Sequence, residues 1–161
     1  MADGNLQRLR ARFVATRGVK EYRATIPAWV APQDIVLEIG CEWGTTTAMI
    51  APHCQEVIGT DVSRECIARA RELHPGIRFE VLDGFDVPAV LALNRPFTKV
   101  YIDISGISGY RSLLDAIALL NTYAALLRPE AIVVKSGALK SFALSCIAWR
   151  SPGDAAGEGG Y

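Results

Sequence analysis

Histidine is scarce in this sequence: the chain has only two among its 161 residues, so a metal site built on histidines is not expected. No apolar run reaches the ~18 residues that suggest a membrane-spanning helix, and we therefore expect no membrane association. The opening Met-Ala-Asp-Gly-Asn does not combine a charged segment with an apolar one, so no secretion signal is predicted.

Cysteine pairs of the Cys-x-x-Cys type are also missing. The four cysteines are Cys41, Cys54, Cys66 and Cys146. Their scatter matches no zinc site, and disulfides are rare in the cytosol. We therefore expect four reduced thiols in a cytoplasmic protein.

An excess of charge of one sign is missing as well, because seventeen Lys and Arg balance seventeen Asp and Glu. Binding to nucleic acid by bulk charge alone is therefore not expected. The charge is uneven, however, since residues 1–24 are strongly basic. Their basic side chains are Arg8, Arg10, Arg12, Arg17, Lys20 and Arg23.

This basic segment has two interpretations. It could contact a polyanion. It could also be the solvated face of a leading helix whose Leu6, Leu9 and Phe13 face inward, which is the more ordinary arrangement. We therefore predict a helical basic leader over residues 1–30.

Apolar residues make up half of the chain, which is enough to bury a core and excludes a disordered class. We expect one domain over residues 1–150. Residues 151–161 are small and polar, and predict a flexible tail.

Short apolar runs alternate with helical patterns along this domain. Strands are predicted at 34–40, 56–61, 77–82, 99–103 and 131–135, and helices at 44–52, 63–74, 87–93, 110–127 and 139–150. This alternation indicates parallel pairing, and continuous β-branched strands indicate helices on both faces. The predicted fold is α/β: a doubly wound, mostly parallel sheet of about five strands.

Acidic residues recur in or at the end of the first four predicted strands, and a lysine ends the fifth. They are Glu38, Asp61, Asp83 and Asp103, followed by Lys135. Ligands of doubly wound sheets bind at the carboxyl ends of the strands. One acid on each strand is an improbable coincidence, so we expect an acidic ligand site at this edge.

The loop after the first predicted strand contains Gly40 and Gly44 but has Glu42 between them. Gly40 permits a tight turn, and Gly44 permits close backbone approach at the helix start. The charge of Glu42 would repel a pyrophosphate, which argues against a dinucleotide and for a cationic or neutral ligand. Asp61 could accept both hydroxyls of a ribose, and Asp83 an adenine amino group with Phe85 beside the ring.

These segments resemble class I S-adenosylmethionine-dependent methyltransferases, which have a Rossmann-like fold. Val-Leu-Glu-Ile-Gly-Cys-Glu-Trp-Gly at 36–44 is similar to their first motif, with Glu42 replacing the middle glycine. Residues 57–63 resemble their ribose-binding strand, 79–84 their adenine-side motif, and 127–134 the segment before strand five. Compared with many members, the sequence does not show the last strand pair.

The resemblance implies S-adenosylmethionine as cofactor. Its implied contacts are Glu38, Gly40, Cys41, Glu42, Gly44, Thr45, Asp61, Val62, Asp83, Gly84, Phe85 and Asp103. Gly-Thr-Thr at 44–46 further resembles fibrillarin-like RNA ribose methyltransferases, whose catalytic Asp and Lys fall on Asp103 and Lys135. In the related rRNA ribose methyltransferases an earlier lysine contributes, and Lys20 could fill its place.

A lysine near the transferable methyl could accept or steer the proton of a ribose hydroxyl, with Asp103 orienting it. Lys135 could instead simply extend from the strand end into solvent. Trp43 and Tyr110 could stack on a base or belong to the core.

The expected function is methyl transfer to an oxygen nucleophile. The resemblance favours an RNA ribose 2′-hydroxyl as the acceptor. One alternative is a small-molecule O-methyltransferase, in which Asp103 would bind a metal or the substrate. Another is a cofactor-binding domain without catalysis, whose last strand would be an exposed edge for a homodimer.

Overall fold

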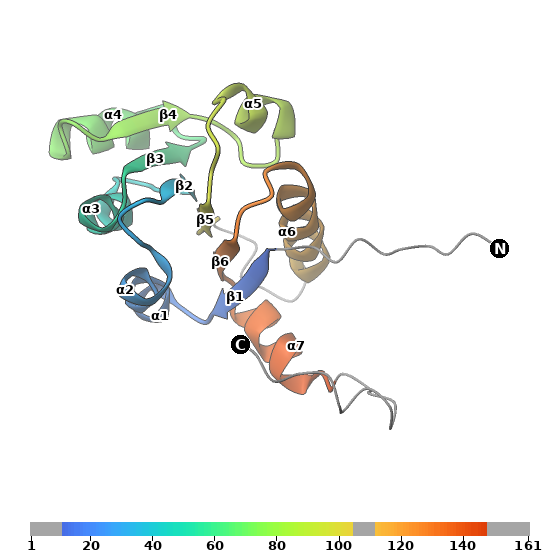
Figure 1. The fold of residues 1–161 in the computed structure, drawn as a ribbon. Helices are drawn as coiled ribbons and strands as arrows, with labels where there is room; N and C mark the ends of the chain where they lie inside the picture. The colour runs from blue at the N-terminus through green and yellow to red at the C-terminus, as the bar shows by residue number, and fades with distance from the viewer. Residues whose placement is uncertain (1–10, 105–111, 148–161) are drawn as a thin grey trace.

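The structure is a computed structural model that describes residues 11–104 and 112–147. Strands and helices alternate along most of this length (Figure 1). The strands are β1 (Arg12–Thr16), β2 (Ile35–Ile39), β3 (Glu56–Asp61), β4 (Arg78–Val81), β5 (Lys99–Ile102) and β6 (Ala131–Lys135). The helices are α1 (Val19–Ala24), α2 (Ile26–Trp29), α3 (Thr45–Ile50), the 3-10 turn η1 (Ala51–His53), α4 (Arg64–Leu73), α5 (Val87–Ala92), α6 (Leu113–Leu126) and α7 (Gly137–Ser145).

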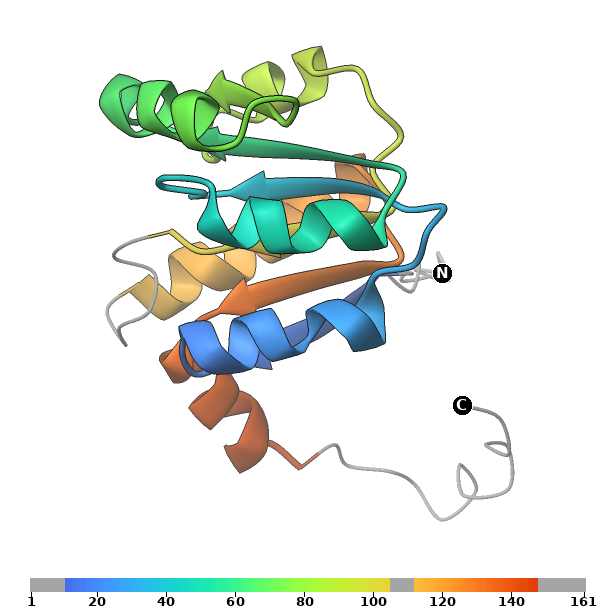
Figure 2. The same cartoon turned by 90° about the vertical axis from the view of Figure 1, so that its left-hand side faces the viewer.

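All six strands form one sheet in the order β1-β6-β5-β2-β3-β4, and every neighbouring pair is parallel. The chain runs outward from β2 through β3 to β4 and then returns to β5 and β6. Helices α1 to α4 lie in front of the sheet in Figure 2, and α6 lies behind it. This is the predicted doubly wound, Rossmann-like fold, and its switch point lies between β5 and β2.

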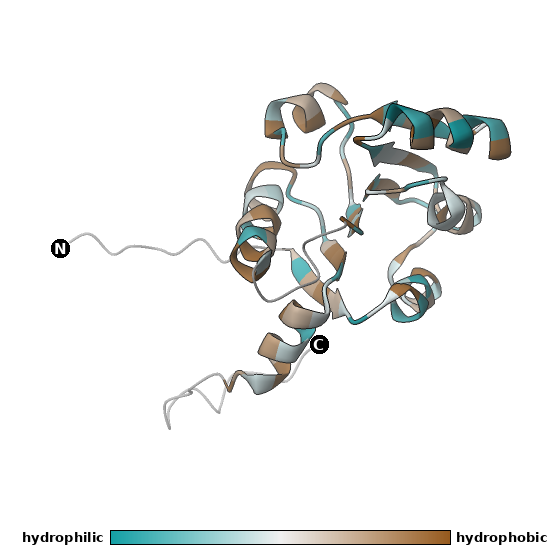
Figure 3. Ribbon diagram, turned by 180° about the vertical axis from the view of Figure 1, so that it is seen from behind, coloured by the Kyte–Doolittle hydropathy of each residue, from teal (hydrophilic) through white to brown (hydrophobic). Residues whose placement is uncertain are grey.

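Each face of the sheet has its own apolar core, because successive strand residues point to opposite faces. In β2, Leu37 and Ile39 pack with buried residues of α5 and α6, whereas Val36 packs with those of α1 and α2. Figure 3 shows more hydrophilic residues on α4 than on α6. Since α6 buries five residues and α4 only two, α6 is the more deeply packed of these helices.

The predicted helical leader is wrong for residues 12–16, which form β1. These residues pair in register with 131–135 of β6. Their sequence, Arg-Phe-Val-Ala-Thr, is rich in β-formers, and a partner strand more than 100 residues away decides the outcome. Phe13 therefore lies in a strand, while Leu6 and Leu9 lie outside the described residues.

The strand β1 also gives the sheet one strand more than predicted. It covers β6, which pairs with β5 on its other side. The prediction that the last strand is an exposed edge for a homodimer is therefore wrong. The edges of the sheet are β1 and β4. Within the described residues no strand follows β6, and the last helix, α7, begins and ends before the predicted 139–150.

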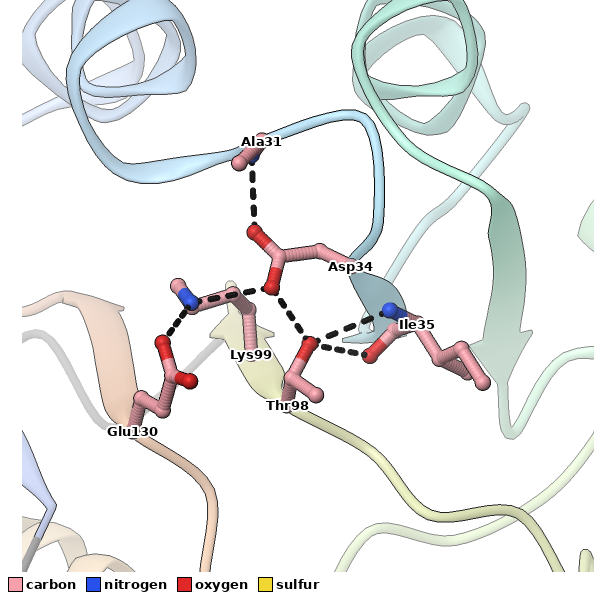
Figure 4. Close-up of polar contacts among 6 residues, drawn as sticks. All are labelled: Ala31, Asp34, Ile35, Thr98, Lys99 and Glu130. Carbon is pink, nitrogen blue, oxygen red and sulfur yellow. Dashed lines mark hydrogen bonds and ion pairs between the residues drawn. The ribbon is translucent and has the colours of Figure 1, made fainter.

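A buried ion pair ties three segments together at the amino edge of the sheet (Figure 4). The ammonium of Lys99 lies 3.0 Å from Asp34 and 2.5 Å from Glu130. Asp34 also accepts hydrogen bonds from the Thr98 hydroxyl at 2.7 Å and the Ala31 N–H at 2.7 Å. The segment before β2 is thereby fixed to the starts of β5 and β6.

Burial opposes the charge of Asp34, but its hydrogen bonds and Lys99 hold the pKa of this carboxyl below its usual value. Burial likewise opposes the charge of Lys99, yet its two carboxylate partners raise the pKa of the ammonium. Both groups are therefore charged in the folded protein around neutral pH. The stabilisation from Asp34 is lost as the pH falls through its folded pKa, and that from Lys99 as the pH rises through its own.

Lys99→Met is expected to lower the free energy of unfolding by about 3–5 kcal/mol, because it leaves a buried carboxylate without its cation. Glu130→Gln is the matched control: the Glu130 side chain is 74% exposed, so its loss should cost at most about 1 kcal/mol. Urea unfolding at neutral pH measures both. Equal losses in the two variants would contradict this account of the pair.

Candidate active site

A cleft of about 420 Å³ opens at the carboxyl edge of the sheet, beside the switch point. It is formed by the ends of β2, β3, β5 and β6 and the segments after β2, β3 and β4. Its lining residues are Ile39, Gly40, Glu42, Asp61, Val62, Cys66, Leu82, Asp83, Gly84, Asp103, Ile104 and Lys135. Both its volume and its place in the fold are those of a small-molecule site.

The loop between β2 and α3 has a backbone that two glycines make possible. Gly40 has a φ of +80°, and a Cβ built on it would lie 2.0 Å from the carbonyl oxygen of Asp103. Gly44 has a φ of +79°, and its Cβ would lie 2.6 Å from the ring of Phe79. Glu42 takes a φ of 50°, which is uncommon for a residue with a side chain. The loop is therefore pressed against β5 on one side and β4 on the other.

Asp61, the last residue of β3, fixes this loop from the side. One oxygen of its carboxylate accepts the N–H of Glu42 at 3.0 Å, and the other accepts the N–H of Ser63 at 2.9 Å. Each carboxylate oxygen can accept a further hydrogen bond. Asp61 can therefore hold the loop and also accept bonds from the hydroxyls of a ligand in the cleft.

The segment after β4 forms the far wall of the cleft. A carboxylate oxygen of Asp83 accepts the N–H of Phe85 at 2.9 Å, and the carbonyl of Gly84 accepts the Tyr123 hydroxyl at 2.6 Å. Val62 and Leu82 add apolar surface to the same cleft. Apolar walls with a carboxylate at the rim suit a flat ring that carries a hydrogen-bond donor.

Asp103 and Lys135 form an ion pair in the cleft. They follow and end the neighbouring strands β5 and β6, and both side chains are partly buried. The pair therefore presents a carboxylate and an ammonium, side by side, next to the Gly40 loop.

Glu38 is buried and does not line the cleft. It is 1% exposed and accepts the Thr47 hydroxyl at 2.5 Å. Burial raises the pKa of Glu38 to about 8; the bond from Thr47 opposes this shift, and the charge of Asp103 adds to it. Glu38 therefore ties α3 to β2 from inside the protein. Cys41 is also buried, and burial raises the pKa of its thiol.

The structure brings together most of the predicted site residues but not all. The predicted residues that line the cleft are Gly40, Glu42, Asp61, Val62, Asp83, Gly84, Asp103 and Lys135. The predicted residues outside its lining are Lys20, Glu38, Cys41, Gly44, Thr45 and Phe85. Lys20 is exposed on α1, so the structure does not join it to Asp103 and Lys135 in the cleft.

Four lining residues were not predicted: Ile39, Cys66, Leu82 and Ile104. Three of them, all apolar, adjoin a predicted acid or glycine in the sequence. They could have been predicted from that position next to a strand end. Cys66 is different, because it enters from α4. Trp43 is exposed and does not line the cleft, and Tyr110 lies outside the described residues.

Charge in the cleft is mainly negative. Glu42, Asp61, Asp83 and Asp103 supply four carboxylates against the single ammonium of Lys135. Such a lining favours a cationic ligand. In residues 11–104 and 112–147, no three His, Cys, Asp or Glu side chains are grouped so that they could hold a metal ion. None of the described helices is long and apolar enough to cross a membrane.

Solved structures with the same fold include two that exceed a TM-score of 0.5. DesVI of Streptomyces venezuelae has a TM-score of 0.56 and 19% identity, over 73% of this chain and 48% of that one. The sugar N-methyltransferase KedS8 of a Streptoalloteichus species has a TM-score of 0.51 and 18% identity, over 83% of this chain and 48% of that one. The chain thus spans about half the length of these proteins, and the likeness shows the fold.

Fibrillarin, solved in complex with Nop5p, matches with a TM-score of 0.41 and 18% identity, over 53% of this chain and 44% of that one. A structural similarity this weak does not support the expected resemblance to ribose methyltransferases. No curated protein sequence matches the chain.

The sequence profile of a family described as "Methyltransferase domain" matches residues 36–130, from β2 to the residue before β6. This match includes Gly40, Asp61, Asp83 and Asp103 of the cleft. Because it covers more than half of the chain, the protein belongs to this family of methyltransferase domains, whose cofactor is S-adenosylmethionine.

Proposed function

We propose that the chain binds S-adenosylmethionine in the carboxyl-edge cleft and transfers its methyl group to an oxygen nucleophile. The observation that carries this proposal is the ion pair of Asp103 and Lys135 in the same cleft as the Gly40 loop and Asp61. The pair places an ammonium beside a carboxylate in the cleft, where the two groups could act on the proton of an acceptor hydroxyl.

The donor set of the cleft fits this cofactor. The free lone pairs of Asp61 can accept the ribose hydroxyls, and Asp83 can accept an adenine amino group beside Val62 and Leu82. The surplus of carboxylates suits the positive sulfonium. When bound, S-adenosylmethionine supplies a methyl group that the sulfonium makes electrophilic.

The ion pair gives the chain its part in the reaction. Lys135 donates a hydrogen bond to the acceptor oxygen and orients it, and its charge stabilises that oxygen as negative charge develops. The proposed base differs from the one expected above: the Asp103 carboxylate, and not the lysine, would accept the hydroxyl proton as the methyl group passes to the acceptor oxygen. The proton would thus end on Asp103, while the cofactor, held by Asp61 and Asp83, would supply the methyl group and keep the electron pair of its S–C bond.

Two classes of acceptor remain candidates for this step. A ribose 2′-hydroxyl of RNA is supported by the Asp103–Lys135 pair, which is the arrangement expected of ribose methyltransferases. A small-molecule hydroxyl is supported by the charge of the cleft, because four carboxylates around the site repel RNA phosphates.

Asp61→Asn is expected to weaken binding of S-adenosylhomocysteine by about 10–100-fold, since it weakens charge-assisted hydrogen bonds to the ribose. Glu65→Gln is the matched control, because Glu65 is exposed on the neighbouring α4 and outside the cleft lining. Calorimetric titration measures both. Equal affinities in the two variants, or no binding by the unaltered protein at millimolar ligand, would refute this site.

Lys135→Met is expected to lower the rate of methyl transfer by about 10²–10⁴-fold while the cofactor affinity changes little. Lys140→Met is the control, because Lys140 pairs with Glu21 outside the cleft. Transfer of a labelled methyl group to short RNAs and to a panel of sugars and phenols, with and without EDTA, measures the rate and identifies the acceptor class. Equal rates in both variants would exclude the proposed role of Lys135.

A further inference from the structure

A second and larger cleft, of about 590 Å³, lies at the opposite end of the strands. The register places Arg12, Lys99 and Ala131 side by side as the first residues of β1, β5 and β6. These three residues line the cleft together with Trp29 from α2 and the segment between α6 and β6. The amino-edge cleft, as we call it, shares no lining residue with the methyl-transfer site.

Two arginines of this cleft have no acidic partner among the described residues. In the part of the chain that the structure describes, neither Arg12 nor Arg128 forms an ion pair. The Arg12 guanidinium lies over the ring of Trp29, 5.8 Å from its centroid. Lys99, in contrast, is held between Asp34 and Glu130 (Figure 4). The unsatisfied positive charge of the cleft is therefore that of its arginines.

The charge of the lining favours an anion. Because Asp34 balances the charge of Lys99, the cations that remain are Arg12 and Arg128, and they face one lining carboxylate, that of Glu130. Low-dielectric walls focus such a surplus on a ligand in the cleft. The planar, forked guanidinium matches the geometry of phosphate better than any other side chain does.

The size and walls of the cleft favour a ligand larger than phosphate. Its volume lies within the range of pockets that hold whole small molecules. Trp29 adds a flat aromatic surface, on which a nucleic-acid base can stack. A phosphate on a planar ring would use both the arginines and this surface.

Arg128 occupies a backbone position that ordinarily takes glycine. It follows the C-cap of α6, precedes Pro129, and has a φ of 52°. Helices commonly end with glycine in this conformation, which is strained for a residue with a side chain. Replacing Arg128 by glycine therefore removes the charge and also the strain at this backbone position. A loss of ligand binding in this variant would then not be caused by a loss of stability.

We propose that the amino-edge cleft binds a nucleotide phosphate, through Arg12 and Arg128 and against Trp29. The phosphate belongs either to a free nucleotide or to the end of an RNA strand, which share this chemistry. The site acts independently of the cofactor cleft at the other edge of the sheet.

Uridine monophosphate is a suitable probe, because it carries no adenine to compete for the cofactor cleft. We expect it to bind the full chain saturably in the presence of S-adenosylhomocysteine and to quench tryptophan fluorescence. Uridine without phosphate should not bind. Trp29→Phe should abolish the quenching, which assigns the signal among the three tryptophans.

Arg128→Gly and Arg12→Gln should each weaken uridine monophosphate by about tenfold or more. Arg128→Gly should leave the urea midpoint unchanged or raise it, while Glu130→Gln should tighten binding because it removes the lining carboxylate. The affinity for S-adenosylhomocysteine should be the same in all three variants, so failure here is distinguishable from failure of the proposed function.

A 5′-phosphorylated oligouridine identifies the source of the phosphate. Tighter binding than the monophosphate assigns the cleft to an RNA end, and equal binding assigns it to a free nucleotide. Three results would overturn the proposal: no saturable binding at millimolar uridine monophosphate, equal binding of uridine, or unaltered affinity in both arginine variants.

Discussion

The close approach of Gly40 to the end of β5 is the constraint on which the cleft depends. A single added carbon at Gly40 would lie 2.0 Å from the Asp103 carbonyl oxygen. This contact brings the β2–α3 loop against Asp103, across the point where the winding of the sheet reverses. Asp61 then fixes the loop from the opposite side. The backbone contact at Gly40 and the Asp61 carboxylate together hold this loop against Asp103.

The chain has no net charge, but charges of opposite sign gather at the two ends of the strands. Carboxylates dominate the carboxyl edge, whereas arginines dominate the amino-edge cleft. Buried polar groups also join neighbouring elements: Glu38 of β2 accepts a bond from Thr47 of α3, and Lys99, which lines the second cleft, pairs with Asp34. A net charge of zero is therefore compatible with two surfaces that would bind ligands of opposite charge.

The fold could be predicted from the sequence because strand and helix patterns alternate with clear boundaries between 34 and 135. The strand-end position of Asp61, Asp83, Asp103 and Lys135 followed directly, since parallel strands end at one edge. The strand β1 could not be predicted, because a pairing with β6 more than 100 residues away stabilises a segment that also fits a helix. Lys20 lies on α1, the helix that follows β1, and outside the cleft lining.

The amino-edge cleft was beyond sequence reasoning, because Arg12, Trp29 and Arg128 come together only through the register of three strands. The sequence showed the basic segment but predicted it as a helix face. Glu38 was expected in the cleft, yet its side chain is buried and accepts a hydrogen bond from Thr47 of α3.

The most direct test of the central claim is a crystal structure of the protein with S-adenosylhomocysteine. The account predicts the ribose at Asp61, the adenine between Val62 and Leu82, and the sulfur facing the Asp103–Lys135 pair. A ligand bound in any other place, or with its sulfur directed away from that pair, would contradict it.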